Sequence, residues 1–252
     1  MPASARVPCG NVCDAGKVGF PSDDWNRAMT WRVQQILAGG IAGLILIARA
    51  QAAAWPDNAA TRLEALALLQ TLNADLLSND SATLTLDRWC DAHKMATPAK
   101  IVAERVQGND KAPTDEVRQL LGVTAADPVR YRHVRLHCGE HVLSEADNWY
   151  VPARLTPDMN QVLDTTDTAF GRAVQALHFR RRTLSAQLLW SPLPQGWEMA
   201  TALPSASKGP LQIPAATIQH RAVLALPDGT PFSLVVETYT NEVLSFPKPP
   251  RP

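Results

Sequence analysis

Two charged side chains that are expected to lie among apolar neighbours are the first candidates for chemistry. In residues 129–136, strict alternation places Arg132 on the same face as the aliphatic residues Val134 and Leu136. Glu237 follows three consecutive aliphatic residues. A buried guanidinium is costly unless it meets an anion, and its planar fork suits a carboxylate. Burial is expected to raise the pKa of Glu237 unless a cation lies beside it.

These two residues permit two interpretations. Arg132 and Glu237 can be each other's partners in a structural ion pair, or they can lie at two ends of one ligand-binding site. In the second case, a carboxyl group with a raised pKa can donate a proton or a hydrogen bond at neutral pH. The sequence pattern leaves both interpretations open.

Two further segments have the chemistry to contact anions, although each also has a common structural explanation. Residues 166–171 have the pattern of a helix N-cap and first turn, where free backbone N–H groups attract anions. Residues 180–182 are three consecutive arginines. We predict that they form a solvated edge of a strand or loop, with an anion contact as the alternative.

Neither a metal site nor a nucleophile is predicted. His133, His137 and His141 recur every four residues, but they straddle a predicted hairpin, and no cysteine or carboxylate stands at zinc spacing. Ser144 and Ser185 lack the G-x-S-x-G context that activates a serine nucleophile. The sequence therefore predicts a site that uses neither a metal ion nor a covalent intermediate.

The elements that position these residues are predicted from hydrophobic periodicity. Helical spacing of apolar residues predicts helices at residues 60–78, 83–94, 115–121, 158–163 and 169–177. Alternation predicts strands at residues 99–106, 129–136, 142–151, 183–190, 218–226 and 231–240, the second and third and the last two being paired as hairpins. Helices followed by hairpins, with little βαβ alternation, predict an α+β fold with a single antiparallel β-sheet and helices packed on one face.

The first part of the chain differs from the rest. Residues 29–52 contain an arginine, an apolar run and then small residues in A-x-A order, which is the pattern of a secretory signal peptide. The apolar run is shorter than the roughly 20 residues that span a bilayer as a helix. We therefore predict export to the periplasm without a stable membrane span after processing, and the alternative is a cytoplasmic protein. Residues 1–28 are interpreted as an upstream segment that precedes the true start at Met29.

Charge and cysteine content restrict the partners. The 24 basic residues equal the 24 acidic ones, so the chain lacks the electrostatic footprint of a nucleic-acid-binding protein. Processing near residue 50 leaves two cysteines, Cys90 and Cys138. In an oxidising compartment these can form a disulfide, or they can remain separate buried thiols. The oligomeric state stays open.

Short segments of residues 75–240, taken in order, resemble the chorismate pyruvate-lyase family and the related ligand-binding domains of some bacterial transcription regulators. Residues 79–83 (NDSAT) are similar to the family's acidic-Asp-Ser-Met-Thr segment. Arg132 stands where the family has its carboxylate-binding arginine. Residues 150–152 (YVP), 168–172 (TAFGR) and 229–237 (GTPFSLVVE) resemble three further family segments, the last of which ends in a ligand-contacting glutamate.

The resemblance implies a chorismate lyase-like domain at residues 55–245, followed by a proline-rich tail at 246–252. It implies a closed internal pocket for a small aromatic carboxylate such as chorismate or 4-hydroxybenzoate. Arg132 is expected to hold the ring carboxylate with main chain near Ala82 and Phe170, and Glu237 to face the hydroxyl end. Elimination of pyruvate from chorismate is driven by aromatisation, so no cofactor is expected, and Glu237 would act at the breaking C–O bond.

Two departures separate this chain from the family pattern. Ala82 replaces a methionine that lines the family pocket, and residues 191–216 form a proline-containing insertion between strands. Export also separates the protein from chorismate, which is a cytoplasmic metabolite. Three functions therefore remain: a cofactor-independent lyase, an exported binder of a small aromatic carboxylate without catalysis, and a scaffold without a ligand.

Overall fold

The computed structural model describes residues 55–108, 110–199 and 201–246 of the chain. The predicted upstream segment, the signal peptide at residues 29–52 and residues 247–252 of the predicted tail lie outside the described residues, and these assignments remain predictions. The first residue of the predicted tail, Phe246, is described and is buried in the main core. Within the described part, none of the helices combines the length and hydropathy of a membrane span.

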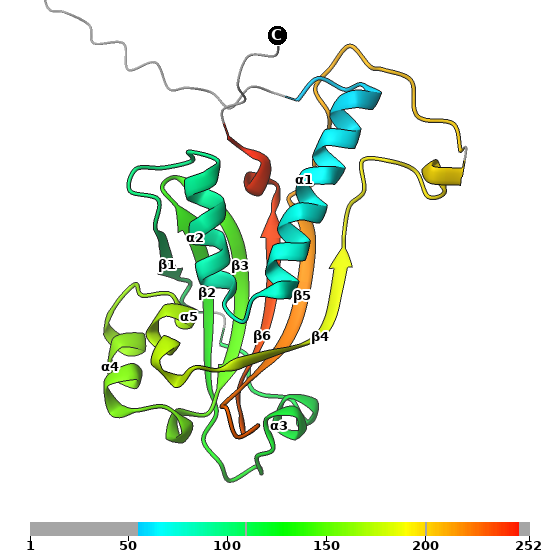
Figure 1. Ribbon diagram of the computed structural model, residues 1–252. Coiled ribbons are helices and arrows are strands. Elements are labelled where there is room, and N and C mark those ends of the chain that lie inside the picture. The colour runs from blue at the N-terminus through cyan, green and yellow to red at the C-terminus, as the bar shows by residue number, and fades with distance from the viewer. Residues whose placement is uncertain (1–54, 109, 200, 247–252) are drawn as a thin grey trace, which may run out of the picture. The chain divides into compact units, whose positions relative to one another are not determined.

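The described strands form one antiparallel sheet of six strands (Figure 1). Their order is β1-β2-β3-β6-β5-β4, so both predicted hairpins are present and their strands β3 and β6 pair with each other. Glycine makes each hairpin turn possible, because Gly139 has φ 56° and Gly229 has φ 89°, a backbone conformation that other residues rarely adopt. The strands are β1 (Ile101–Arg105), β2 (Arg130–Cys138), β3 (His141–Tyr150), β4 (Arg180–Leu188), β5 (Ala216–Ala225) and β6 (Pro231–Thr240).

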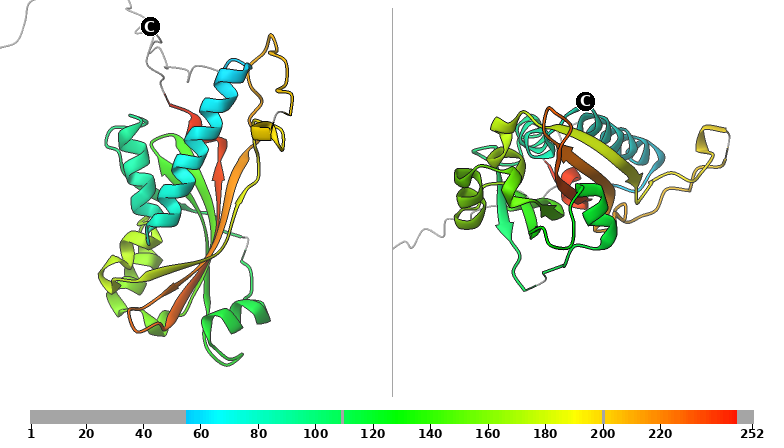
Figure 2. Two further views of the ribbon diagram at one scale, coloured as in Figure 1. Left: turned by 45° about the vertical axis from the view of Figure 1, so that its right-hand side comes forward. Right: turned by 90° about the horizontal axis from the view of Figure 1, so that it is seen from below.

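The two long helices α1 and α2 cover one face of the sheet, which we call the inner face (Figures 1 and 2). Ser81 separates them, since its side chain accepts a hydrogen bond from the Leu84 backbone N–H and caps α2. The short helix α3 packs against the opposite, outer face through Val117 and Leu121. The predicted α+β class with one antiparallel sheet is confirmed. The helices are α1 (Ala59–Ser78), α2 (Ala82–Ala92), α3 (Asp115–Leu121), α4 (Pro157–Thr165) and α5 (Phe170–Ala173), with 3-10 turns η1 (Pro152–Arg154), η2 (Gln175–Leu177), η3 (Trp197–Met199) and η4 (Asn241–Leu244).

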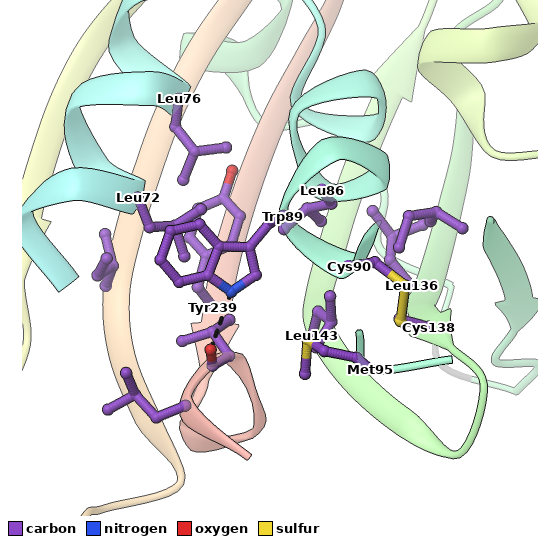
Figure 3. Close-up of a cluster of buried hydrophobic side chains, with 14 of the residues drawn as sticks. Leu72, Leu76, Leu86, Trp89, Cys90, Met95, Leu136, Cys138, Leu143 and Tyr239 are labelled. Carbon is purple, nitrogen blue, oxygen red and sulfur yellow. Dashed lines mark hydrogen bonds between the residues drawn. A yellow bond between two sulfur atoms is a disulfide. The ribbon is translucent and has the colours of Figure 1, made fainter. Parts of the chain in front are cut away.

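The main hydrophobic core lies between the inner face and the helices α1 and α2 (Figure 3). Leu72 and Leu86 are fully buried there, and Tyr239 fills the space on the sheet side. Trp89 packs in the same cluster, and its indole N–H donates to the Val243 carbonyl oxygen at 2.9 Å. This core fixes α2 on the sheet, and α2 carries the residues that later form one wall of the site.

A disulfide joins α2 to the end of β2. Cys90 and Cys138 are both fully buried, and their Cα atoms lie 6.1 Å apart (Figure 3). Of the two alternatives that the sequence left open, the structure therefore has the pairing. The bond links one helix to the strand that carries Arg132.

The edge strand β4 differs from its prediction. It begins at Arg180, three residues earlier than expected, because residues 180–183 pair with β5, starting with Arg180 opposite Ala225. The three consecutive arginines therefore belong to a strand, and the expectation that all three are solvated is wrong: alternation turns Arg181 inward, where its side chain is 3% exposed. The inserted segment, residues 191–216, runs from β4 to β5 beside the start of α1, and its Met199 is 81% exposed.

Candidate functional site

A pocket opens between the inner face of the sheet and the first residues of α2 and α5, and we call it the inner pocket. It contains about 440 Å³ of space, part of which is open to solvent. The β-sheet wall is built by register, because Val134, Ala146 and Glu237 stand opposite one another on three adjacent strands. The lining residues are Asp80, Ser81, Ala82, Thr83, Val134, Leu136, Ala146, Asn148, Phe170, Gly171, Phe179, Arg181, Leu224, Val235 and Glu237.

The helical wall of the inner pocket depends on a close approach between α5 and α2. A Cβ atom on Gly171 would lie 2.7 Å from Ser81 Oγ and 3.0 Å from Thr83 Oγ1. Only glycine permits this distance, so the predicted turn at residues 166–171 serves to pack two helix starts together. Its first helical residue, Phe170, is buried against the pocket.

The substitution Gly171→Ala is expected to lower the free energy of unfolding by about 1–3 kcal/mol, because one added methyl group overpacks a tight contact. Denaturant titration measures this loss. Gly209→Ala is the matched control, since nothing lies within 4 Å of the Cβ position at Gly209, and its effect is expected to stay within about 0.5 kcal/mol. Equal stabilities of the two variants would contradict the assigned role of Gly171.

Glu237 lies inside the inner pocket with a cation beside it. Arg181 Nη2 donates to Glu237 Oε2 at 2.5 Å, and the two side chains are 3% and 9% exposed. The Tyr239 hydroxyl donates to the same oxygen at 3.2 Å. The partner of Glu237 is therefore Arg181, and the interpretation of Arg132 and Glu237 as a mutual ion pair is wrong. Because Arg181 and Tyr239 both donate to it, Glu237 Oε2 is a hydrogen-bond acceptor in this pocket.

Behind this pair lies a buried histidine. His220 stands opposite Glu237 in the β5–β6 register and is fully buried. Its Nε2 lies 2.8 Å from Asn73 Oδ1 on α1. Burial lowers the pKa of His220, an effect that the negative charge of Glu237 partly opposes. The imidazole is therefore neutral at physiological pH and serves to join α1 to the sheet.

Arg132 is buried as alternation predicts, at 4% exposure. Its three guanidinium nitrogens, Nε, Nη1 and Nη2, are buried and have no hydrogen-bond partner within the described residues. Burial, followed by repulsion from Arg105, lowers the pKa of Arg132 to about 10. This side chain is a cation that has lost its hydration without gaining an anion.

Arg132 lines a different pocket from Glu237. We call this second pocket the edge pocket. It lies at the end of β2 where the strand extends beyond its pairing with β1. The pocket contains about 820 Å³ of space, part of which is open to solvent. The structure thus brings Ala82, Phe170 and Glu237 together. It separates Arg132 from Glu237, so the expectation that these two side chains lie at two ends of one pocket is wrong. The edge pocket is lined by Arg105, Asp110, Lys111, Ala112, Pro113, Val129, Arg130, Tyr131, Arg132, Tyr150 and Asp164.

The three histidines of the hairpin each contact a carboxylate. His133 Nδ1 lies 2.9 Å from Asp147, His137 Nε2 lies 2.8 Å from Glu104, and His141 Nδ1 lies 2.7 Å from Glu242. Over residues 55–108, 110–199 and 201–246, no group of three or more His, Cys, Asp or Glu side chains has the arrangement of a metal site. The three histidines thus form separate contacts with three different carboxylates, although they recur every four residues in the sequence.

Comparison with solved structures gives remote similarities. PhnF from Mycobacterium smegmatis has 13% sequence identity and a TM-score of 0.43, over 69% of this chain and 70% of that one. The possible transcriptional regulator YydK from Bacillus subtilis has 12% identity and a TM-score of 0.35, over 60% of this chain. The match spans 62% of YydK, less than two thirds of its length.

No protein-family model matches the chain. The uncharacterized protein y4mC of Sinorhizobium fredii (strain NBRC 101917 / NGR234) is 63% identical over 196 residues, which cover 77% of this chain and 83% of that protein. This chain therefore belongs to the same family as y4mC of Sinorhizobium fredii.

Proposed function

We propose that this domain binds a small organic anion and that Arg132 holds its charged group. The observation that carries the proposal is the buried guanidinium without a partner. An uncompensated buried charge costs several kcal/mol of folding free energy, so a fold that retains one is expected to bind an anionic ligand with it. A carboxylate that accepts hydrogen bonds from Arg132 removes most of this cost, because charge-assisted pairs to arginine are short and bidentate.

The edge pocket around Arg132 suits an acid with an aromatic body. Tyr131 and Tyr150 line this pocket together with Arg132, so aromatic surface lies in the same pocket as the buried guanidinium. The resemblance to chorismate pyruvate-lyases supports the same ligand class, a small aromatic carboxylate of the 4-hydroxybenzoate type.

Calorimetric titration of the purified protein with benzoate and 4-hydroxybenzoate tests the proposal. Binding is expected with the natural protein and is expected to be lost in Arg132→Met. Arg135→Met is the matched control: Arg135 lies on the same strand but on the outer face, where it pairs with Glu145 at 3.0 Å. If Arg132→Met binds both acids as the natural protein does, the proposed anion site is wrong.

A lyase that releases pyruvate from chorismate is the second candidate. The specific observation in its favour is that Ala82, Phe170 and Glu237 line one pocket. These are three of the four residues that the resemblance places together, and the fourth, Arg132, lines the edge pocket. Because Arg181 pairs with Glu237, catalysis here would rely on orienting the substrate and on electrostatic complementarity at the breaking C–O bond, with Glu237 as an acceptor. No organic cofactor or metal ion enters this proposal.

Incubation of the purified protein with chorismate, followed by absorbance of 4-hydroxybenzoate, separates the two candidates. A lyase is expected to form product at a rate that falls by about 100-fold or more in Glu237→Gln, the range that positioned polar groups contribute. Absence of product, together with binding of 4-hydroxybenzoate that depends on Arg132, identifies a binder without catalysis. A protein that neither binds nor converts either compound would be a scaffold.

Export to the periplasm is proposed as well. The pattern of residues 29–52 predicts it, and the disulfide between Cys90 and Cys138 supports it, because structural disulfides persist in oxidising compartments. Mass spectrometry of the protein from a bacterial host with a periplasm is expected to find an N-terminus near residue 50. An intact Met1 would contradict both the late start and the export. Export favours the binder over the lyase, since chorismate is cytoplasmic.

A further inference from the structure

We infer that the edge pocket takes a doubly charged anion, a phosphate monoester or a dicarboxylate, and that Arg105 and Arg132 bind it together. The inference rests on the proposed anion site at Arg132 and specifies the charge of its ligand. It assigns Arg105 a role that sequence analysis did not.

The strand register places the two arginines next to each other. Arg105 stands opposite Val134 in the β1–β2 pair, and alternation puts Val134 and Arg132 on the same inner face. Arg105 and Arg132 are therefore diagonal cross-strand neighbours, with Cα atoms about 7–8 Å apart, which is within reach of long side chains. Both line the edge pocket.

The two other cations of the edge pocket, Arg130 and Lys111, are already paired. Arg130 forms an ion pair with the Asp164 carboxylate at 2.7 Å, and Lys111 forms one with Asp147 on the outer face at 2.6 Å. Arg105 donates to the main-chain carbonyl oxygen of Asp164 at 2.9 Å and forms no ion pair within the described part of the chain.

Two positive charges thus remain in one pocket without an ion-pair partner. Arg132 has no hydrogen-bond partner among the described residues, and the positive charge of Arg105 adds to the effect of burial on it. The carboxylate of Asp110 also lines the pocket, and it forms no ion pair with Arg105 or Arg132. A single carboxylate ligand that binds one guanidinium in a bidentate manner leaves the other guanidinium without a ligand oxygen. A phosphate or a pair of carboxylates matches both, because arginine binds these groups in a bidentate manner.

Calorimetric titrations with four probes test the inference: benzoate, phenyl phosphate, phthalate and inorganic phosphate. Phenyl phosphate or phthalate is expected to bind about tenfold more tightly than benzoate. One additional charge-assisted hydrogen bond, between Arg105 and the second negative charge of the ligand, contributes about this much affinity. Comparison of these two distinguishes a phosphate ligand from a dicarboxylate. Inorganic phosphate shows whether the aromatic ring contributes to the affinity.

Variants of Arg105 separate this inference from the proposed function. Arg105→Gln is expected to abolish the preference for the doubly charged probes over benzoate, because it removes the second guanidinium and leaves Arg132 in place. Arg180→Gln is the control, since this arginine is 80% exposed and points away from the edge pocket toward Asp80.

Each result identifies which statement fails. If benzoate binds through Arg132 and the doubly charged probes bind no better, the inference is overturned and the proposed anion site stands. If the preference exists but survives in Arg105→Gln, the assignment to Arg105 is overturned. If no probe binds, both statements are overturned.

Discussion

Replacing Arg132 by methionine is expected to raise the free energy of unfolding of the ligand-free protein while it abolishes anion binding. All three guanidinium nitrogens are buried without a hydrogen-bond partner in the described residues, so the folded state carries their desolvation cost. Unsatisfied buried polar groups cost about 1–3 kcal/mol, and charged groups more. Methionine has a similar length and no charge, so the variant is expected to gain about 1–3 kcal/mol.

Urea denaturation of both proteins, with and without 4-hydroxybenzoate, measures this gain. The acid is expected to raise the unfolding midpoint of the natural protein and to leave that of Arg132→Met unchanged, because only a ligand that binds the folded state stabilises it. Arg135→Met, on the outer face with a side chain that is 42% exposed, is expected to change stability by no more than about 0.5 kcal/mol. A destabilised Arg132→Met would mean that Arg132 already has a structural partner.

The opposite signs of these two effects distinguish a binding residue from a structural one. A structural arginine stabilises the fold through its partners, so its removal lowers stability. A buried arginine that has no partner until a ligand binds lowers the stability of the ligand-free protein. Its removal therefore raises that stability. The natural ligand can be sought by the same measurement, since the correct anion is expected to give the largest shift of the midpoint.

The residues of the inner face of the sheet could be predicted from the sequence because they follow from alternation along a single strand. Alternation with a period of two residues placed Arg132 beside Val134 and Leu136, and the structure buries all three. The glycines of the two hairpin turns marked where the strands reverse. Glu237 was predicted to be buried for the same reason, because the residues around it in the strand are apolar on both faces.

The partners of these residues could not be predicted because they depend on non-local register. Arg181 meets Glu237 only because β4 begins at Arg180 and pairs with β5, which in turn pairs with β6. Three consecutive arginines give no signal about which one turns inward until the start of the strand is known. The separation of Arg132 from Glu237 into two pockets likewise depends on how α4, α5 and the loop after β1 pack on the sheet.

Removing the disulfide is expected to produce the largest loss of stability. Cys90 and Cys138 are 48 positions apart, and a crosslink over a loop of this length reduces the entropy of the unfolded chain. The double variant Cys90→Ala with Cys138→Ala is therefore expected to lose about 2–4 kcal/mol of unfolding free energy. Alanine is preferred to serine because both positions are fully buried and a hydroxyl there would lack a partner.

Reductant provides the control for this prediction and connects stability to the site. Dithiothreitol is expected to lower the urea midpoint of the natural protein to that of the double variant and to leave the double variant unchanged. Because both sulfurs are buried, reduction is expected to require unfolding and to proceed slowly in the native protein. The disulfide ties α2, which begins at Ala82 in the inner pocket, to β2, which carries Arg132. A protein produced in a reducing compartment is therefore expected to have both lower stability and weaker anion binding. Equal stability of the oxidised and reduced forms would contradict this role and would show that the hydrophobic core alone holds α2 and β2 together.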